Sequence, residues 1–334
     1  MRLQRGLAFF TMLALGAAAQ AVTIEWVVVG NAGNAPDTRY ATPGYGAVAY
    51  EYLIGKYEIT AGQYTEFLNA VAATDTYGLY NTSMWTSDYG CKIQRIGASE
   101  PYSYSVAPDR ADRPVNYVSF WDAARFANWM HHGQPTGLQG PGTTEDGAYI
   151  NVGNQTTFAR VADALFFIAT EDEWYKAAYY DPNKFGPGLP GYWEYPTMSD
   201  TAPSNQLIDP DPGNNATFWD ADYTIGSPYW MTLVGAHENS ESGYGTFDQG
   251  GNVWEWNETV LYTDFRGLRG GSWNGGAGYL SASLRNISGP SSGSNLIGFR
   301  LAGSLESTEI PEPATVSLLG IAVAAMLRRR RRRA

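Results

Sequence analysis

The stretch FDQGGNVWEW, residues 247–256, combines acidic, flexible and large apolar side chains in ten consecutive positions. Asp248 and Glu255 carry hard oxygen ligands. Between them, Gly250 and Gly251 permit a turn with positive φ, which a residue with a Cβ atom resists. The stretch ends in three apolar anchors: Val253, Trp254 and Trp256. Together these residues predict a tight turn that aromatic side chains fix to a buried core.

Two further segments rich in glycine and apolar residues follow, LRGGSW at 268–273 and GFRL at 298–301. The chain of 334 residues contains 38 Gly, 23 Tyr and 11 Trp. This composition predicts many turns held by aromatic side chains, and few long helices or strands. The length allows one large domain or two ordinary ones, and a hydrophobic content of 44% allows a sizeable core.

The charge and the reactive residues argue against several functional classes. The formal net charge is −11, but eight of the 22 basic residues lie at the two ends, so 14 basic residues face 33 acidic ones in the body. An acidic body argues against nucleic-acid binding and suits an extracellular protein that holds cations. Cys91 is the only cysteine, which excludes an intramolecular disulfide. The three histidines are too few and too poorly spaced for a convincing zinc or iron cluster.

Three segments carry the sequence signal of a helix N-terminus, and they begin at Thr60, Ser119 and Thr170. His131 and His132 stand at the end of the helix expected after Ser119. Adjacent side chains on a helix point apart, so we prefer a role at the helix C-terminus over a metal-binding pair. In each segment a Ser or Thr cap precedes a reciprocal polar partner by three positions: Thr60 with Gln63, Ser119 with Asp122, and Thr170 with Glu173.

Apolar and β-branched runs predict strands within residues 23–30, 47–57 and 165–168. In the second run the apolar residues alternate, which is typical of a strand with one buried face. Residues 75–112 and 181–245 are polar or rich in turn-forming residues and have no clear period. We interpret both as long surface loops.

The two ends of the chain are typical of an exported protein. Residues 1–21 contain two arginines, an apolar run and a small-x-small cleavage site, as in a secretory signal. At the other end PEP, at 311–313, precedes apolar or small residues at 314–327 and six arginines at 328–333. That run is shorter than the roughly 20 residues of an ordinary span, so it predicts a transient or marginal anchor in the inner membrane.

This C-terminal tail resembles the PEP-CTERM sorting signal of bacteria that make exopolysaccharide. The tripeptide, the apolar run and the arginine block occur in that order at residues 311–333. The resemblance implies recognition and cleavage by an exosortase-type enzyme. We therefore expect an exported protein at the cell surface, in the extracellular matrix, or anchored to the membrane through its tail.

The three central motifs resemble the signature of the formylglycine-generating enzyme, or sulfatase-modifying factor, domain family. They are GNVWEW at 251–256, RGGSW at 269–273 and GFR at 298–300, in the family's order. The resemblance implies an α+β, C-type-lectin-like fold with a small antiparallel sheet, a few short helices and much irregular chain. The expected division is a signal peptide at 1–21, one domain at 22–302, a linker at 303–310 and the sorting segment at 311–334.

Active oxidases of this family use two cysteines that bind copper and activate oxygen. The corresponding positions fall at about Gly275 and Leu280, and Cys91 lies far away in the sequence. Because Cu(I) needs soft thiolate ligands, we expect no copper. We therefore hypothesise a catalytically silent domain. The alternative is a divergent formylglycine-generating-type oxidoreductase, without the copper cysteines, that acts on exported proteins.

The resemblance also implies a structural calcium ion. Two carboxylates bridged by a glycine turn can converge on a hard cation at ~2.3–2.6 Å, whereas the alternative is that they merely cap turns beneath the tryptophans. A second site would begin at Asn215 and Ala216, but it has no clear later acidic ligand. By position, the ligands of the first site would be Asp248, the carbonyls of Gly251 and Val253, and Glu255.

We hypothesise that the domain is a binding or structural module of the exopolysaccharide matrix, with polysaccharide or a surface protein as its partner. Arg269, Arg285 and Arg300 are either anion-binding groups or, as we prefer, buried partners of carboxylates. Residues 273–284 distinguish a binding module from an enzyme. A deep pocket with convergent polar groups there would favour an enzyme, and a shallow aromatic surface would favour glycan or protein binding.

Overall fold

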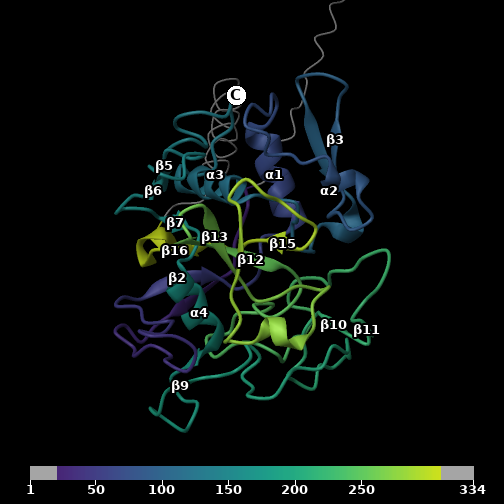
Figure 1. Ribbon diagram of the computed structural model, residues 1–334. Coiled ribbons are helices and arrows are strands. Elements are labelled where there is room, and N and C mark those ends of the chain that lie inside the picture. The colour runs from purple at the N-terminus through teal and green to yellow at the C-terminus, as the bar shows by residue number, and fades with distance from the viewer. Residues whose placement is uncertain (1–20, 310–334) are drawn as a thin grey trace, which may run out of the picture.

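The computed structural model describes residues 21–309, so the expected sorting segment and nearly all of the expected signal peptide lie outside the described residues (Figure 1). Within 21–309, no helix is both long and apolar enough to span a bilayer. The α-helices are α1 (Ala61–Val71), α2 (Ser83–Thr86), α3 (Phe120–His131) and α4 (Glu171–Tyr179), and the 3-10 helices are η1 (Pro108–Arg110), η2 (Ala277–Leu280) and η3 (Leu305–Glu309).

The expected starts of α1, α3 and α4 are confirmed, because each helix begins directly after its predicted cap and has a complete capping box. At α1, Thr60 Oγ1 accepts from the Gln63 amide at 3.2 Å, and Gln63 Oε1 accepts from the Thr60 amide at 2.9 Å. Helices α1 and α3 lie side by side in Figure 1. Their aromatic rings meet in the core, where Tyr64 stacks on Phe126.

Two four-stranded sheets form the framework. The first is antiparallel, in the order β1 (Trp26–Val29), β2 (Tyr52–Gly55), β16 (Ala302–Gly303) and β7 (Phe166–Phe167). The second has the order β14 (Asn286–Ser288), β13 (Phe265–Arg269), β12 (Trp254–Leu261) and β15 (Ile297–Gly298), with β12 and β15 parallel. With its short helices, this arrangement confirms the α+β fold class.

The second sheet brings the three central motifs together. Glu255 on β12 lies opposite Arg269 on β13 and, on the other side, opposite Gly298 on β15. Strand β12 therefore stands between the other two motifs, although these are about 30 residues apart in the sequence. Of the candidate calcium ligands, Glu255 belongs to this sheet, and Arg269 lies opposite it on β13.

The structure differs from the expected loops and alternation at three places. All four residues of β2 are buried, because β2 pairs with β1 on one side and β16 on the other and both of its faces are covered. Gly303, the expected first residue of the linker, lies within β16 and pairs with Leu53 and Phe166. The expected loop 75–112 contains a paired hairpin, β3 (Ile93–Ile96) and β4 (Ser103–Val106).

Three two-residue pairings complete the described strands. The expected loop at 181–245 is largely irregular, as predicted, and only very short strands interrupt it. Such strands lack enough residues to show a period of two in the sequence. The pairs are β5 (Tyr149–Ile150) with β6 (Ala159–Arg160), β8 (Tyr180–Asp181) with β9 (Gly191–Tyr192), and β10 (Trp219–Asp220) with β11 (Asp222–Tyr223).

Candidate functional site

Glu255 forms a buried ion pair with Arg300 at the centre of the second sheet. Both side chains are fully buried. Arg300 donates from Nε to Glu255 Oε2 at 2.6 Å and from Nη2 to Oε1 at 2.7 Å. The indole N–H of Trp174 donates to Oε2 at 2.7 Å. Both oxygens of Glu255 are therefore occupied by protein donors.

Two further carboxylates lie near this ion pair. Asp248 has a positive φ of 60°, and its Oδ2 accepts from the Gly235 amide at 2.6 Å. Burial raises the pKa of Asp248 to about 6. Glu58 accepts from the side chain of Asn252 at 3.0 Å, and burial, reinforced by Asp248 and Glu255, raises its pKa well above the usual range. One arginine thus faces more carboxylates than it can neutralise.

The expected calcium ligands of the first site already make contacts within the protein. Glu255 accepts from Arg300 on both oxygens, and the Gly251 amide donates to the Gly270 carbonyl at 2.8 Å. The amide of Val253 donates to Glu58 Oε1 at 3.3 Å. Within residues 21–309, no cluster of three His, Cys, Asp or Glu side chains is arranged to hold a metal ion. Calcium at these residues stays a prediction.

The second expected calcium site centres on Asp211 in the structure, a residue that the sequence did not single out. Asn215 donates from Nδ2 to Asp211 Oδ1 at 2.5 Å, and Ser240 donates to Oδ2 at 2.7 Å. The amide of Ala216 donates to the Ser204 carbonyl at 3.0 Å. Asn215 therefore serves as a hydrogen-bond donor that holds a loop carboxylate, and a cation here likewise stays a prediction.

The positions that carry copper cysteines in related oxidases have structural roles here. Leu280 is fully buried and packs against Ala216 and Phe218. Gly275 closes a turn through a bond from its amide to the Ser272 carbonyl at 3.0 Å. Cys91 is buried, and burial raises the pKa of its thiol to about 11, so it is a poor source of thiolate.

The remaining predicted residues also have protein partners. Leu165 donates from its amide to His131 Nδ1 at 3.2 Å, and His132 lies 3.0 Å from the Asp146 carboxylate, so the two histidines serve different neighbours. Arg269 and Arg285 both bind the Glu171 carboxylate, at 2.8 and 2.9 Å from their Nε atoms. These contacts match the structural roles that we prefer for the histidines and the arginines.

Four aromatic side chains form a cluster next to Gly275, one of the two positions that carry copper cysteines in related oxidases. Tyr89 stacks on Trp273 with ring centroids 5.5 Å apart, and Trp230 lies 5.3 Å from Trp273. Tyr223 lies 5.0 Å from Trp230 and 5.7 Å from Trp273. Trp273 is buried and forms the floor, whereas Tyr89 is 40% exposed. We call Tyr89, Tyr223, Trp230 and Trp273 the aromatic cluster.

The aromatic cluster also contains an unusual residue and a polar edge. Trp230 has a positive φ of 66°, and its buried indole N–H has no hydrogen-bond partner among the described residues. Such backbone outliers and unpaired donors are costly and concentrate at functional sites. The hydroxyl of Tyr223 donates to Asn274 Oδ1 at 3.3 Å, which places polar atoms beside the rings.

The sequence did not identify this cluster, because its members come from distant segments. Tyr89 lies in the expected loop 75–112, and Tyr223 and Trp230 lie in the expected loop 181–245. The high tyrosine and tryptophan content was the available signal, but composition does not say which rings meet. Only Trp273 belongs to one of the central motifs.

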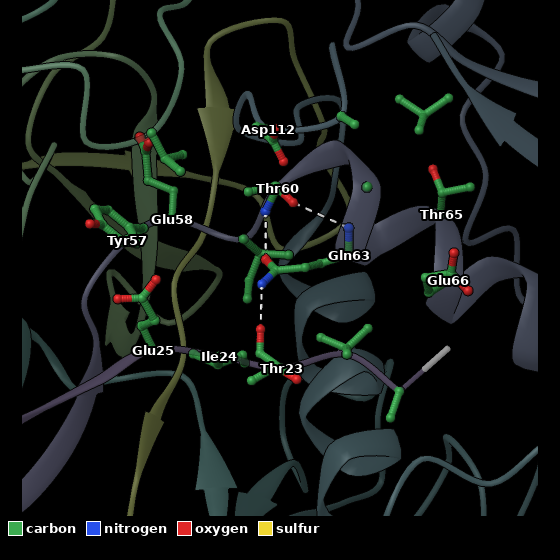
Figure 2. Close-up of a pocket in the computed structure, with 17 residues that line it drawn as sticks. Thr23, Ile24, Glu25, Tyr57, Glu58, Thr60, Gln63, Thr65, Glu66 and Asp112 are labelled. Atoms are coloured by element: carbon green, nitrogen blue, oxygen red, sulfur yellow. Dashed lines mark hydrogen bonds between the residues drawn. The ribbon is translucent and has the colours of Figure 1, made fainter. Parts of the chain in front are cut away.

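A deep pocket is not found at residues 273–284 among the four pockets described within 21–309. The pocket of about 730 Å³ lies at the start of α1 (Figure 2). Its polar groups serve the fold, because Gln63 binds the Thr60 amide and donates to the Thr23 carbonyl at 2.9 Å. The choice between an enzyme and a binding module at residues 273–284 stays a prediction.

The side chain of Glu258, on β12 of the second sheet, leads us to predict that the stability of the protein depends measurably on pH. Glu258 accepts from the Tyr149 hydroxyl at 2.8 Å and lies 3.2 Å from Arg160. Burial raises the pKa of Glu258 to about 7, although Arg160 opposes the shift. The folded state therefore holds this proton more tightly, and the resulting stability, complete below the unfolded pKa, is lost as the pH rises through about 7.

Glu258→Gln is expected to reduce the fall in unfolding free energy between pH 5 and pH 8 by about 2–3 kcal/mol. Urea unfolding at a series of pH values measures it. Asp122 and Asp248, whose pKa values burial raises to about 6, leave a residual fall in the variant. Glu51→Gln, at an exposed position, is the matched control. A pH profile unchanged by Glu258→Gln would contradict the prediction.

The motifs that begin at Gly251, Arg269 and Gly298 meet at one sheet of an α+β domain. This combination defines the sulfatase-modifying-factor class. Residues 18–305 match the model of the sulfatase-modifying factor enzyme 1-like domain, and the chain belongs to this family. Residues 309–332 match the PEP-CTERM protein-sorting motif. The protein is therefore exported and surface-sorted, with a C-terminal tail that exosortase-type sorting machinery recognises.

Three individual proteins are similar to this chain, and the solved structure of Treponema denticola variable protein 1 supports the fold. Hercynine oxygenase from Mycobacterium tuberculosis is 25% identical over 283 residues, which are 75% of this chain and 52% of that protein, so the chain spans about half the length of this curated relative. Treponema denticola variable protein 1 is 18% identical, with a TM-score of 0.51 over 85% of this chain and 98% of that one. PvdO from Pseudomonas aeruginosa is 16% identical, with a TM-score of 0.45 over 86% and 100%.

Proposed function

We propose that this protein is a catalytically silent binding module, and that the aromatic cluster binds a glycan of the extracellular matrix. The observation that supports the proposal is the position of the cluster. Trp273 and Asn274 belong to the segment that leads to the copper cysteines in related oxidases, and here the segment contributes a ring and an amide to an aromatic surface. The thiolates that copper chemistry requires are absent from this segment of the sequence.

The chemistry of the cluster suits a sugar. Tyrosine and tryptophan combine a flat apolar face, which can pack against the C–H groups of a sugar ring, with a polar atom that can bind a hydroxyl. Tyr89 offers an exposed ring, and the pair of Tyr223 and Asn274 offers a hydroxyl and an amide beside it. The sorting tail supports delivery of this surface to the cell exterior.

Tyr89→Ala with Tyr223→Ala is expected to weaken binding to polysaccharide at least about tenfold, because aromatic anchors carry much of the energy of such contacts. Binding of the purified protein to cellulose, chitin and mannan measures the effect. Tyr262→Ala is the matched control, because Tyr262 is 80% exposed and makes no ring contact with the cluster.

Three results would overturn the proposal. Equal binding by the double variant and the natural protein would show that the cluster is not the binding surface. Oxidation of a peptide cysteine by the purified protein, with stoichiometric copper retained, would instead establish the oxidoreductase alternative. Failure to bind any of the three polysaccharides would leave a surface protein as the partner, and would contradict the glycan proposal.

A further inference from the structure

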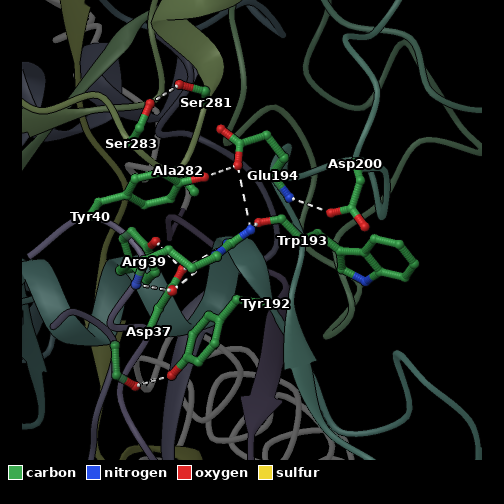
Figure 3. A network of polar contacts seen from close by, with 12 residues as sticks. Asp37, Arg39, Tyr40, Tyr192, Trp193, Glu194, Asp200, Ser281, Ala282 and Ser283 are labelled. Carbon is green, nitrogen blue, oxygen red and sulfur yellow. Dashed lines mark hydrogen bonds and ion pairs between the residues drawn. The ribbon is translucent and has the colours of Figure 1, made fainter.

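A second site, remote from the aromatic cluster in the sequence, is a pocket of about 490 Å³ between three segments. Residues 36–39 form one side, and the connection from β8 to β9 supplies Lys184 and Phe185 on another. Tyr192, Glu194 and Asp200 complete the lining. Figure 3 shows Arg39, Tyr40 and Glu194 directed toward one another, with Asp200 beside Glu194.

Arg39 is held in a fixed position within this pocket. Asp37 is buried and accepts from Arg39 Nε at 2.9 Å and from Nη2 at 2.7 Å, while the Tyr175 hydroxyl fixes Asp37 from behind at 2.7 Å. Arg39 Nη2 also donates to the Trp193 carbonyl at 3.1 Å. These bonds direct Nη1 toward Glu194, whose Oε2 lies 3.4 Å away.

Glu194 and Asp200 present unused acceptors. Glu194 Oε2 accepts from Arg39 and Tyr40, whereas Oε1 has no partner within the described chain. The amide of Glu194 donates to Asp200 Oδ1 at 3.0 Å, and Lys184 donates to the same oxygen at 2.7 Å. Asp200 Oδ2 has no hydrogen bond to any described residue. Two carboxylate oxygens and one N–H of Arg39 Nη1 are thus oriented but available.

The pocket also has an aromatic wall. Phe185 is 68% exposed, and its ring lies so close to Gly191 that a Cβ there would come within 2.6 Å of it. The ammonium of Lys184 lies 5.3 Å from the centre of the same ring. Phe185 therefore packs against the backbone of Gly191, while most of its side chain stays exposed to a ligand.

We propose that this pocket binds a neutral sugar unit. Three carboxylates face two cations, so an anionic ligand is repelled, whereas sugar hydroxyls can donate to Glu194 and Asp200 and accept from Arg39. Phe185 packs against the C–H face of the ring. The volume falls within the range of about 300–1,000 Å³ for small-ligand pockets, which combine apolar walls with a few placed polar groups. The proposal rests on these contacts alone and does not require the aromatic cluster to bind.

Titration of the purified protein with maltotriose, cellotriose and mannotriose, followed by calorimetry, tests the proposal. At least one neutral trisaccharide is expected to bind, and Phe185→Ala and Glu194→Gln are each expected to weaken it about tenfold. Glucuronic acid is expected to bind more weakly than glucose because of the excess carboxylate. Phe185→Ala should fold normally because the ring is largely exposed, and circular dichroism checks this.

The variants of the two sites separate the two proposals. Tyr89→Ala with Tyr223→Ala should leave trisaccharide binding at the pocket unchanged, and Phe185→Ala should leave polysaccharide binding by the aromatic cluster unchanged. The pocket proposal is overturned if none of the neutral trisaccharides binds at concentrations up to about 10 mM. Titration to that concentration detects even binding free energies weaker than about −4 kcal/mol. Binding that both Phe185→Ala and Glu194→Gln leave intact, or a preference for glucuronic acid, overturns it as well.

Discussion

Glu255→Ala is expected to lower the free energy of unfolding by about 3–5 kcal/mol, because it leaves the Arg300 guanidinium buried without its counter-charge. Neither side chain is exposed, and their closest atoms are 2.6 Å apart. The remaining donors of Arg300 bind the carbonyls of Gly55 and Phe247, at 2.9 and 2.7 Å. The substitution would therefore weaken the junction between β2, β12 and the turn that precedes β12.

Two further variants test this interpretation by urea unfolding. Glu255→Met with Arg300→Met removes both charges and should recover much of the loss, because buried apolar pairs often equal or exceed a buried ion pair in stability. Glu25→Ala breaks a surface pair with Lys56 at 3.6 Å and should cost less than about 1 kcal/mol. A loss at Glu255→Ala as small as that of Glu25→Ala would contradict a structural ion pair.

The same measurements in the presence and absence of calcium address the predicted metal site. A ligand that binds only the folded state raises the free energy of unfolding. A calcium-dependent rise that Asp248→Asn and Glu255→Gln both remove would support the predicted ligands. With Arg300 already bound to both oxygens of Glu255, we expect the ion pair to account for the stability without calcium.

Gly251→Ala is expected to cost about 3 kcal/mol or more, the second large effect. Gly251 has a φ of +94°, and a Cβ there would overlap the backbone of Thr217. That overlap adds to the strain of a left-handed conformation, which is about 1–2 kcal/mol for a residue with a side chain. The Thr217 carbonyl also accepts from the Asn252 amide at 2.7 Å, so the turn cannot move aside without losing this bond.

Gly245→Ala separates the strain from the overlap. Gly245 has a comparable φ of +84°, but no atom lies within 4 Å of a Cβ built there. Its substitution should therefore cost only the strain, about 1–2 kcal/mol. Thermal and urea unfolding of the two variants measure the difference. Equal losses would show that the contact of Gly251 with Thr217 is not a constraint on the turn.

The sequence predicted those parts of the fold that depend on near neighbours. A capping box joins residues three positions apart, so Thr60 with Gln63 was sufficient to place the start of α1. Strand β2 was harder to predict. Its expected alternation is absent because β1 and β16 cover both of its edges and neighbouring elements cover both faces, and β16 lies about 250 residues further along the chain.

The candidate sites depend on still longer connections. Glu255 was singled out as a calcium ligand, which stays a prediction, whereas its ion pair with Arg300 and its neighbour Glu58 depend on residues from other elements. The aromatic cluster joins Tyr89 to Trp273 across the length of the domain. No local pattern states which of the many aromatic residues are in contact.

The sequence by itself determined the family, the C-terminal sorting motif and the helix starts, because sequence motifs, charge runs and capping pairs involve residues close together in the chain. Only the tertiary structure decided which carboxylates are neutralised, which rings form a surface, and that Arg39 and Glu194 line one pocket. Hydrogen bonds and ring contacts act over a few ångströms, and folding alone brings residues from distant segments within that range.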